Sequence, residues 1–263
     1  MKIDVKHYPG ARVITLLCLF VLYAPLLVIS IYSFNSLRSI TTWGGFTFDW
    51  YIKAFHNPSI QSATFNSLII AISAATIATC IALAAAMAMI KGKPLKHASL
   101  MVGVINLPLV IPEIVTAIAS LIFFVAINMT LGLNTVLIAH IVFCIPFAYL
   151  PISTRLKDIS KRFDEAAFDL YATRWQAFRY VTLPMAMPGL LSGFMLAFIV
   201  SLDDFIVANM VAGPGATTLP MAIYSLVRIG FTPEINAIST LLLLVSTLFV
   251  TASWLVNRPT KQA

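Results

Sequence analysis

Six long apolar segments dominate the chain and limit what it can fold into. They cover residues 12–34, 65–90, 99–127, 133–153, 187–208 and 235–256. About 20 apolar residues are enough to carry a helix across a hydrocarbon core that is about 30 Å thick. Because a helix satisfies its own backbone hydrogen bonds in lipid, we expect an all-α, polytopic membrane protein with six transmembrane helices.

The composition agrees with a membrane location. Of the 263 residues, 60% are hydrophobic and only 10% are charged, whereas soluble domains carry about 25% charged residues. The net charge of +7 would also suit a nucleic-acid-binding protein, but basic residues that face an anionic leaflet explain it. We therefore expect lipid contact and no nucleic acid. Cys18, Cys80 and Cys144 are isolated from one another, so we expect neither a disulfide nor a metal site.

The basic residues predict the orientation, because Lys and Arg collect in cytoplasmic loops. All but three of the 17 Lys and Arg residues flank the chain ends or lie between segments two and three or four and five. They are Lys2, Lys6, Arg12, Lys91, Lys93, Lys96, Arg155, Lys157, Lys161, Arg162, Arg174, Arg179, Arg258 and Lys261. Both termini are therefore expected in the cytoplasm, and segment 12–34 is interpreted as a retained span rather than a cleaved signal.

Two outer connections, residues 35–64 and 209–234, are long and rich in Gly, Pro, Asn, Ser, Thr and aromatic residues. Aromatic side chains in the first connection suit the interfacial belt of a membrane. A docking surface for an external partner is the alternative. The aromatic residues concerned are Trp43, Trp50, Tyr51 and Phe55. No soluble domain or internal repeat is visible, so residues 1–263 are predicted to form one transmembrane domain.

The cytoplasmic connection 154–186 contains helical patterns of its own. Apolar residues recur at i, i+3, i+4 and i+7 and predict one apolar stripe on a short helix. They are Phe163, Ala166, Ala167 and Leu170. Asp164 and Glu165 lie in its first turn, where negative charge favours the positive end of the helix dipole.

A second short helix is predicted to start at Thr173. Thr173 and Gln176 fit the capping box S/T-x-x-E/Q, and Trp175, Phe178 and Val181 would line an apolar side. Pro184 is expected to stop this helix. The prediction is a helix-turn-helix with exposed apolar side chains that require a partner.

This connection resembles a known motif. Glu165-Ala166-Ala167 followed by Val181-Thr182-Leu183-Pro184 is similar to the EAA loop of bacterial ABC-importer permeases. The resemblance implies a type I importer permease fold and a loop that couples the spans to an ATPase. The implied coupling residues are Glu165, Ala166, Ala167, Leu170, Tyr171, Leu183 and Pro184. Tyr171 stands at the position where the family usually has a glycine. Either the turn therefore takes another shape, or the partner holds Tyr171.

Other segments look like the spermidine/putrescine permeases of the same superfamily. They are residues 33–36, 201–204, 213–220 and 233–237. The resemblance implies a bacterial inner-membrane subunit that pairs with a homologous second permease, as a heterodimer, and with two cytoplasmic ATPase subunits and a periplasmic polyamine-binding protein. The sequence has no G-x-x-x-x-G-K-[ST] phosphate loop, so we expect no enzyme and no cofactor, with ATP bound by the partner.

Three acids interrupt apolar segments: Glu113, Asp203 and Asp204. Charged residues at membrane depth are functional candidates by default, and no Lys or Arg lies in segments three and five to neutralise them. They predict a pathway for a cationic substrate, although capping of helix ends or contact with a partner subunit would also explain them. Since neighbouring helical residues point about 100° apart, we expect Glu113 and Asp204 to face the cavity and Asp203 to be structural. Tyr224, Trp43 and Phe205 are candidate cation-π faces.

Three alternatives remain open from sequence. The first is an ABC permease for another cationic or organic solute. The second is an ion-coupled secondary carrier, which would usually show paired repeats. The third is an intramembrane enzyme or redox subunit. His140 is the only histidine expected at membrane depth, and one histidine supplies neither a bis-His haem site nor a His-rich metal site. We expect it to be a packed residue. Pro108, Pro112 and Pro146 predict kinks in the spans.

Overall fold

A computed structural model describes residues 10–39, 42–92, 96–159, 161–229 and 233–256. The elements within these ranges are helical apart from one isolated bridge between Asn35 and Phe46, so the all-α prediction is confirmed. The helices are α1 (Ala11–Tyr32), α2 (Asp49–His56), α3 (Pro58–Ile90), α4 (Ala98–Val110), α5 (Glu113–Ala126), α6 (Leu133–Asp158), α7 (Lys161–Asp169), α8 (Arg174–Ala177), the π-helix η2 (Phe178–Thr182), α9 (Leu183–Asp203), α10 (Ile206–Val211), α11 (Leu219–Ile229) and α12 (Pro233–Val256). Lys2, Lys6, Lys93, Arg258 and Lys261, used above for the orientation, lie outside the described residues.

Five helices in the described residues are long and apolar enough to cross a membrane, or six if a bent pair of helices counts as one span. The pair is α4 and α5, which meet at an angle of 105°. The predicted kink at Pro112 is confirmed, but it separates two helices, so the prediction of one helix over residues 99–127 is wrong. Pro112 has no N–H to donate, and Ile111 before it is extended with ψ of 134°, as residues before proline prefer. Pro108 and Pro146 lie inside α4 and α6, which continue through them.

The fifth span also differs from the prediction of 187–208. α9 ends at Asp203, Asp204 is extended with ψ of 127°, and a separate helix starts at Ile206. Two other spans are longer than their apolar segments, because α3 begins at Pro58 and α6 continues to Asp158. These extra turns carry polar residues, which hydropathy alone does not assign to a span.

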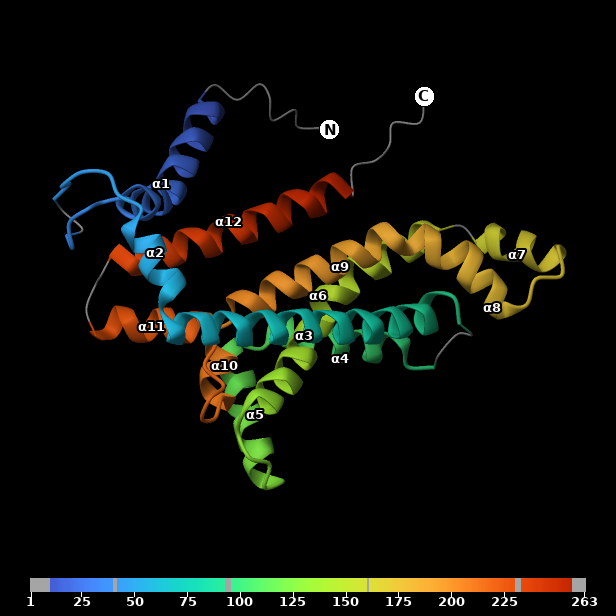
Figure 1. The fold of residues 1–263 in the computed structure, drawn as a ribbon. Coiled ribbons are helices and arrows are strands. Elements are labelled where there is room, and N and C mark those ends of the chain that lie inside the picture. The colour runs from blue at the N-terminus through green and yellow to red at the C-terminus, as the bar shows by residue number, and fades with distance from the viewer. Residues whose placement is uncertain (1–9, 40–41, 93–95, 160, 230–232, 257–263) are drawn as a thin grey trace. The chain divides into compact units, whose positions relative to one another are not determined.

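Helices α6 and α9 run antiparallel and in close contact (Figure 1). Cys144 Sγ lies 3.4 Å from the carbonyl oxygen of Ala197, and Arg155 Nε donates to the carbonyl of Met185 over 2.9 Å. A Cβ on Gly193 would lie 2.7 Å from the carbonyl oxygen of Ala148, so glycine is what allows the two backbones to approach this closely. The pair forms a rigid support with α7 and α8 at one end and α10 at the other.

A buried apolar cluster holds α10 against α5 and α6. Its members come from α3, α5, α6 and α10, and each is almost fully buried: Ile70, Ala117, Phe124, Val136, Ala139, Val207, Ala208 and Val211. The side chain of Thr135 adds a 2.7 Å hydrogen bond to the carbonyl of Val211. The short α10 is thus fixed by packing rather than by its own length, since isolated helices of this size are unstable.

The chain forms two compact units, one of residues 1–58 and 223–244 and one of residues 59–222 and 245–263. In the first unit, the side chain of Asn35 accepts from Gly44 N–H over 2.8 Å and donates to the carbonyls of Ser39 and Thr42. Trp50 Nε1 donates to the Asn35 carbonyl over 2.7 Å. Trp50 is only 5% exposed, so it organises this connection and is not the interfacial anchor that we predicted. Trp43 and Phe55 are exposed.

Candidate functional site

Residues 161–184, named the coupling segment after the role that the resemblance implies, contain the predicted pair of short helices. At the start of α8, the Thr173 hydroxyl accepts from Gln176 N–H over 3.3 Å, and the Gln176 side chain accepts from Thr173 N–H over 2.8 Å. The predicted capping box is confirmed. The expected stop at Pro184 is wrong, because α8, η2 and α9 form one helical run from Arg174 to Asp203. Pro184 lies two residues after the end of the π-helix η2, where Leu183 N–H donates to the Phe178 carbonyl and the hydrogen-bond pattern of the run changes.

Tyr171 adopts the backbone conformation that glycine favours, with φ of +59°. Ala172 N–H donates to the Ala167 carbonyl over 3.0 Å and Tyr171 N–H to the Phe168 carbonyl over 2.9 Å. These two bonds form a Schellman ending, in which a left-handed residue follows the helix. The alternative that the turn takes another shape is therefore wrong. Tyr171 is 96% exposed within this subunit, so its side chain is available to a partner.

The coupling segment presents large apolar side chains at its surface. Leu170 is 82% exposed and Trp175 is 64% exposed. Phe163, Tyr180 and Glu165 are also exposed, whereas Ala167 is buried and Leu183 half-buried. An exposed apolar group of this kind marks an interaction surface.

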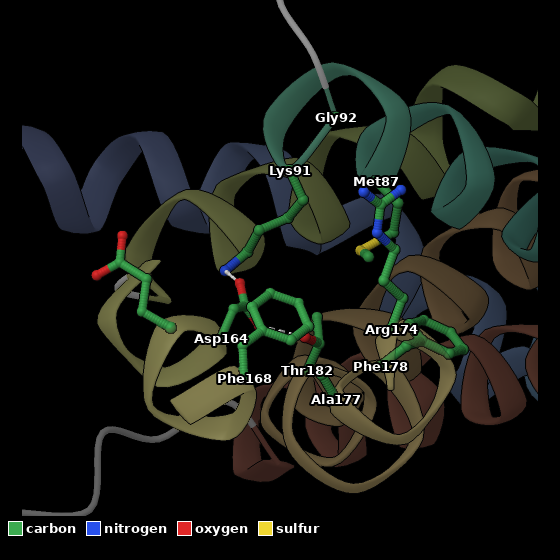
Figure 2. A pocket seen from close by; sticks show the side chains of 10 residues that line it. Met87, Lys91, Gly92, Asp164, Phe168, Arg174, Ala177, Phe178 and Thr182 are labelled. Carbon is green, nitrogen blue, oxygen red and sulfur yellow. Dashed lines mark hydrogen bonds and ion pairs between the residues drawn. The ribbon is translucent and has the colours of Figure 1, made fainter. Parts of the chain in front are cut away.

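Behind this surface, Asp164 joins the coupling segment to the end of α3 (Figure 2). Lys91 Nζ lies 2.6 Å from Asp164 Oδ2, and the Thr182 hydroxyl donates to Asp164 Oδ1 over 2.9 Å. Sequence reasoning assigned Asp164 only to the helix dipole. No spacing pattern links Lys91 with Asp164, because they are 73 residues apart.

A second cluster lies where α9 ends and α10 begins. Asp204 is 6% exposed, and its two carboxylate oxygens accept from Val207 N–H over 3.3 Å and from Ala208 N–H over 2.8 Å. His140 Nε2 lies 3.1 Å from Asp204 Oδ2, an ion-pair distance without hydrogen-bond alignment. The other ring nitrogen of His140 bonds Ser201 Oγ over 2.8 Å. His140 is packed in the interior as expected, but its contacts with Asp204 and Ser201 were not predicted.

Glu113 is the first residue of α5, directly after the break at Pro112, and α5 is in close contact with α10, whose first N–H groups bind Asp204. Asp203 is exposed in this subunit, whereas Asp204 is buried. The expectation that Glu113 and Asp204 face the cavity and that Asp203 is structural stays a prediction. Tyr224 is 52% exposed and belongs to the other compact unit, so its role stays a prediction.

Comparison with known proteins identifies the family. The model of the binding-protein-dependent transport system inner membrane component matches residues 78–258. The chain belongs to this family of importer permeases. Two relatives from Escherichia coli (strain K12) extend the match to most of the chain. The putrescine transport system permease protein PotI is 40% identical over 248 residues, covering 92% of this chain and 88% of that protein. The spermidine/putrescine transport system permease protein PotC is 39% identical over 241 residues, covering 90% and 89%.

Solved structures show the same fold. A bacterial ABC transporter involved in import of the acidic polysaccharide alginate matches with a TM-score of 0.67 and 16% identity, over 94% of both chains. The MetNI methionine ABC transporter matches with a TM-score of 0.63 and 22% identity, over 74% of this chain and 95% of the other. The permease thus has the type I importer fold with a bent third span. It is a multi-pass membrane protein of an ABC importer, which replaces the secondary-carrier and enzyme hypotheses.

Proposed function

We propose that the cargo of this permease is a polyamine, putrescine or spermidine, received from an extracytoplasmic binding protein. Relatives named for these substrates are about 40% identical over about 90% of the chain. The observation that carries the proposal is the placement of two acids on helices that pack together, Glu113 at the start of α5 and the buried Asp204 at the start of α10. Two carboxylates in an apolar environment repel each other unless a proton or a cation lies between them. An alkyl ammonium group supplies such a cation.

The three acids have different proposed roles, according to how exposed and how constrained each carboxylate is. Asp204 has both oxygens engaged by the N-terminus of α10, so it holds its position and contributes a fixed negative field. Glu113 and the exposed Asp203 are freer to meet an ammonium group. Tyr224, Trp43 and Phe205 each stay a candidate cation-π face.

The transporter is proposed to contain a homologous second permease, as a heterodimer, and two cytoplasmic ATPase subunits. Exposed Leu170, Tyr171 and Trp175 support a docking role for the coupling segment, with Glu165 beside them. ATP binds the partner ATPase and this chain needs no cofactor. Both termini lie in the cytoplasm in this proposal, which puts the coupling segment on the same side as the ATPase.

Uptake of labelled putrescine and spermidine tests the cargo. Cells that lack their own polyamine import receive the complete transporter with this chain unaltered, absent, or changed as Glu113→Gln or Asp203→Asn. Each change should lower uptake about tenfold, the effect of about 1.4 kcal/mol on a barrier, at unchanged protein levels. Asp158→Asn is the matched control, because Asp158 is exposed at the far end of α6. Uptake that does not depend on the chain would leave an importer permease with another cargo.

Competition sharpens the same assay. Unlabelled spermidine should compete, whereas butanediol, which has hydroxyl groups in place of the two amines of putrescine, should not. Equal competition by the diol would contradict recognition by carboxylates.

Two further assays test the assembly. A fluorescent protein fused after Ala263 should fluoresce and an alkaline phosphatase fusion there should be inactive, as expected for a cytoplasmic end. Recovery of two differently tagged copies of this chain from one purified complex would contradict the heterodimer.

A further inference from the structure

Asp164 is bound on both sides of its carboxylate. Oδ2 receives Lys91 Nζ at 2.6 Å and Oδ1 receives the Thr182 hydroxyl at 2.9 Å. Lys91 Nζ also donates to the carbonyl of Ile159 over 3.4 Å. The group therefore joins the end of α3, the residue after α6, α7 and the π-helix that leads into α9.

These contacts are shielded from solvent. The side chains of Lys91 and Asp164 are 10% and 19% exposed, and Thr182 is 3% exposed. Ion pairs on an exposed surface are weakened by water and salt, and a partly buried pair is weakened less. The geometry therefore stays defined when the surface of the segment is pushed by a partner.

Lys91 owes its position to the way in which α3 ends. The N–H groups of Lys91 and Gly92 both donate to the Met87 carbonyl, over 3.0 and 3.1 Å. A Cβ on Gly92 would lie 2.2 Å from the carbonyl oxygen of Ala88. Glycine is needed at this point for the helix to close on itself and aim Lys91 at the coupling segment.

The pair lies at an open place rather than in a packed core. A cavity of about 430 Å³ lies between the end of α3 and the coupling segment (Figure 2). Met87 and Lys91 line it from α3, and Phe168 and Phe178 line it from the coupling segment. Apolar packing does not fill this space, so the polar contacts of Asp164 carry the connection across it. Thr182 closes the π-helix η2, a type of segment that is frequent at functional sites.

We propose that Lys91, Asp164 and Thr182 form a joint that transmits the movement of the coupling segment to α3 and α9. The proposal rests on the proposed function, in which that segment docks on the ATPase. Lys91, Asp164 and Thr182 are positioning residues. Without them the exposed face of the segment still docks, but its displacement no longer reaches the spans.

Transport per ATP hydrolysed tests this role in proteoliposomes that contain the complete transporter and its loaded binding protein. Lys91→Met, Asp164→Asn and Thr182→Val should assemble and hydrolyse ATP, with cargo moved per ATP reduced at least about fivefold. Exchange of the charges, Lys91→Asp with Asp164→Lys, should restore much of the loss. Asp169→Asn and Lys157→Met, which change exposed residues, are the matched controls and should behave as the unaltered chain.

A distance measurement tests the joint without any cargo. Spin labels on Ala88→Cys in α3 and Asp169→Cys in α7, both exposed positions, are placed in a background in which Cys18, Cys80 and Cys144 are serine. The distance between labels should stay constant between nucleotide-free and ATP-trapped complexes, and should change on trapping when Asp164→Asn is added. Failure of polyamine uptake alone would refute the cargo and leave this result intact.

Two outcomes would overturn the joint. One is transport per ATP and label distances in Asp164→Asn that match the unaltered chain. The other is failure of all three single variants to assemble, which would reduce the group to a folding contact.

Discussion

Asp164 in the coupling segment and Asp204 at the end of α9 each receive a basic side chain from another helix. Asp164 contacts Lys91 and the Thr182 hydroxyl beside the cavity of the coupling segment, and its side chain is 19% exposed. Asp204 meets His140 and two backbone N–H groups, with its side chain 1% exposed. Partial access to water makes the first contact separable from folding, whereas the second is part of the protein interior. The comparison therefore distinguishes a contact that is proposed to transmit movement from a contact that stabilises the protein interior.

The largest expected effect is loss of stability on Asp204→Ala. This change removes the acceptor for two N–H groups at the start of α10 and leaves His140 without its partner, at a cost of about 3 kcal/mol. Asp204→Asn keeps an acceptor and should lose about half of that. Thermal unfolding of the purified protein measures both. Asp203→Ala is the control, and an equal loss there would show that burial does not distinguish the two aspartates.

Replacement of His140 should have the next largest effect. His140→Leu removes the bond to Ser201 and the contact with Asp204, and should cost about 2 kcal/mol. His97→Leu, at an exposed position, is the matched control in the same unfolding assay. If His140→Leu unfolds like the unaltered protein, the support role of this cluster is wrong.

Lys91→Met should affect transport more strongly than it affects stability. Because Asp164 keeps access to water, we expect a loss of only about 1 kcal/mol, beside the larger loss of coupling described above. The measurement is the unfolding midpoint of Lys91→Met and of His140→Leu in parallel. A larger shift for Lys91→Met would contradict the distinction between joint and support.

The smallest expected effect is a gain. Tyr171→Gly relieves a left-handed conformation and should stabilise the coupling segment by about 1 kcal/mol. Hydrogen exchange over residues 161–177 measures this gain in the isolated permease. If the partner holds Tyr171, uptake falls although the segment is more stable. Uptake equal to that of the unaltered chain would remove Tyr171 from the docking surface.

Local patterns predicted much of the fold and the coupling segment. The six spans follow from apolar length, and the capping box at Thr173 follows from a spacing of three residues. A kink at Pro112 was predicted, but the full break there and the separate α10 were missed because hydropathy continues through both. The partners of Asp164 and Asp204 were not predictable, because Lys91 and His140 reach them across 73 and 64 residues of chain.

The different burial of the two aspartates could not be predicted for a related reason. Helical geometry says only that neighbours point apart, and it does not say which of the two is buried. The end of α9 decides this, since Asp204 leaves the helix and caps α10.

The most direct test of the account is accumulation of labelled putrescine in proteoliposomes that contain the complete transporter, with this chain unaltered or changed as Glu165→Arg. The account predicts accumulation that requires ATP and the binding protein and that is abolished by Glu165→Arg, while the altered chain still assembles with its partner permease. Accumulation that persists with Glu165→Arg would contradict coupling through this segment. A transporter that consumes ATP but moves no putrescine or spermidine would contradict the cargo.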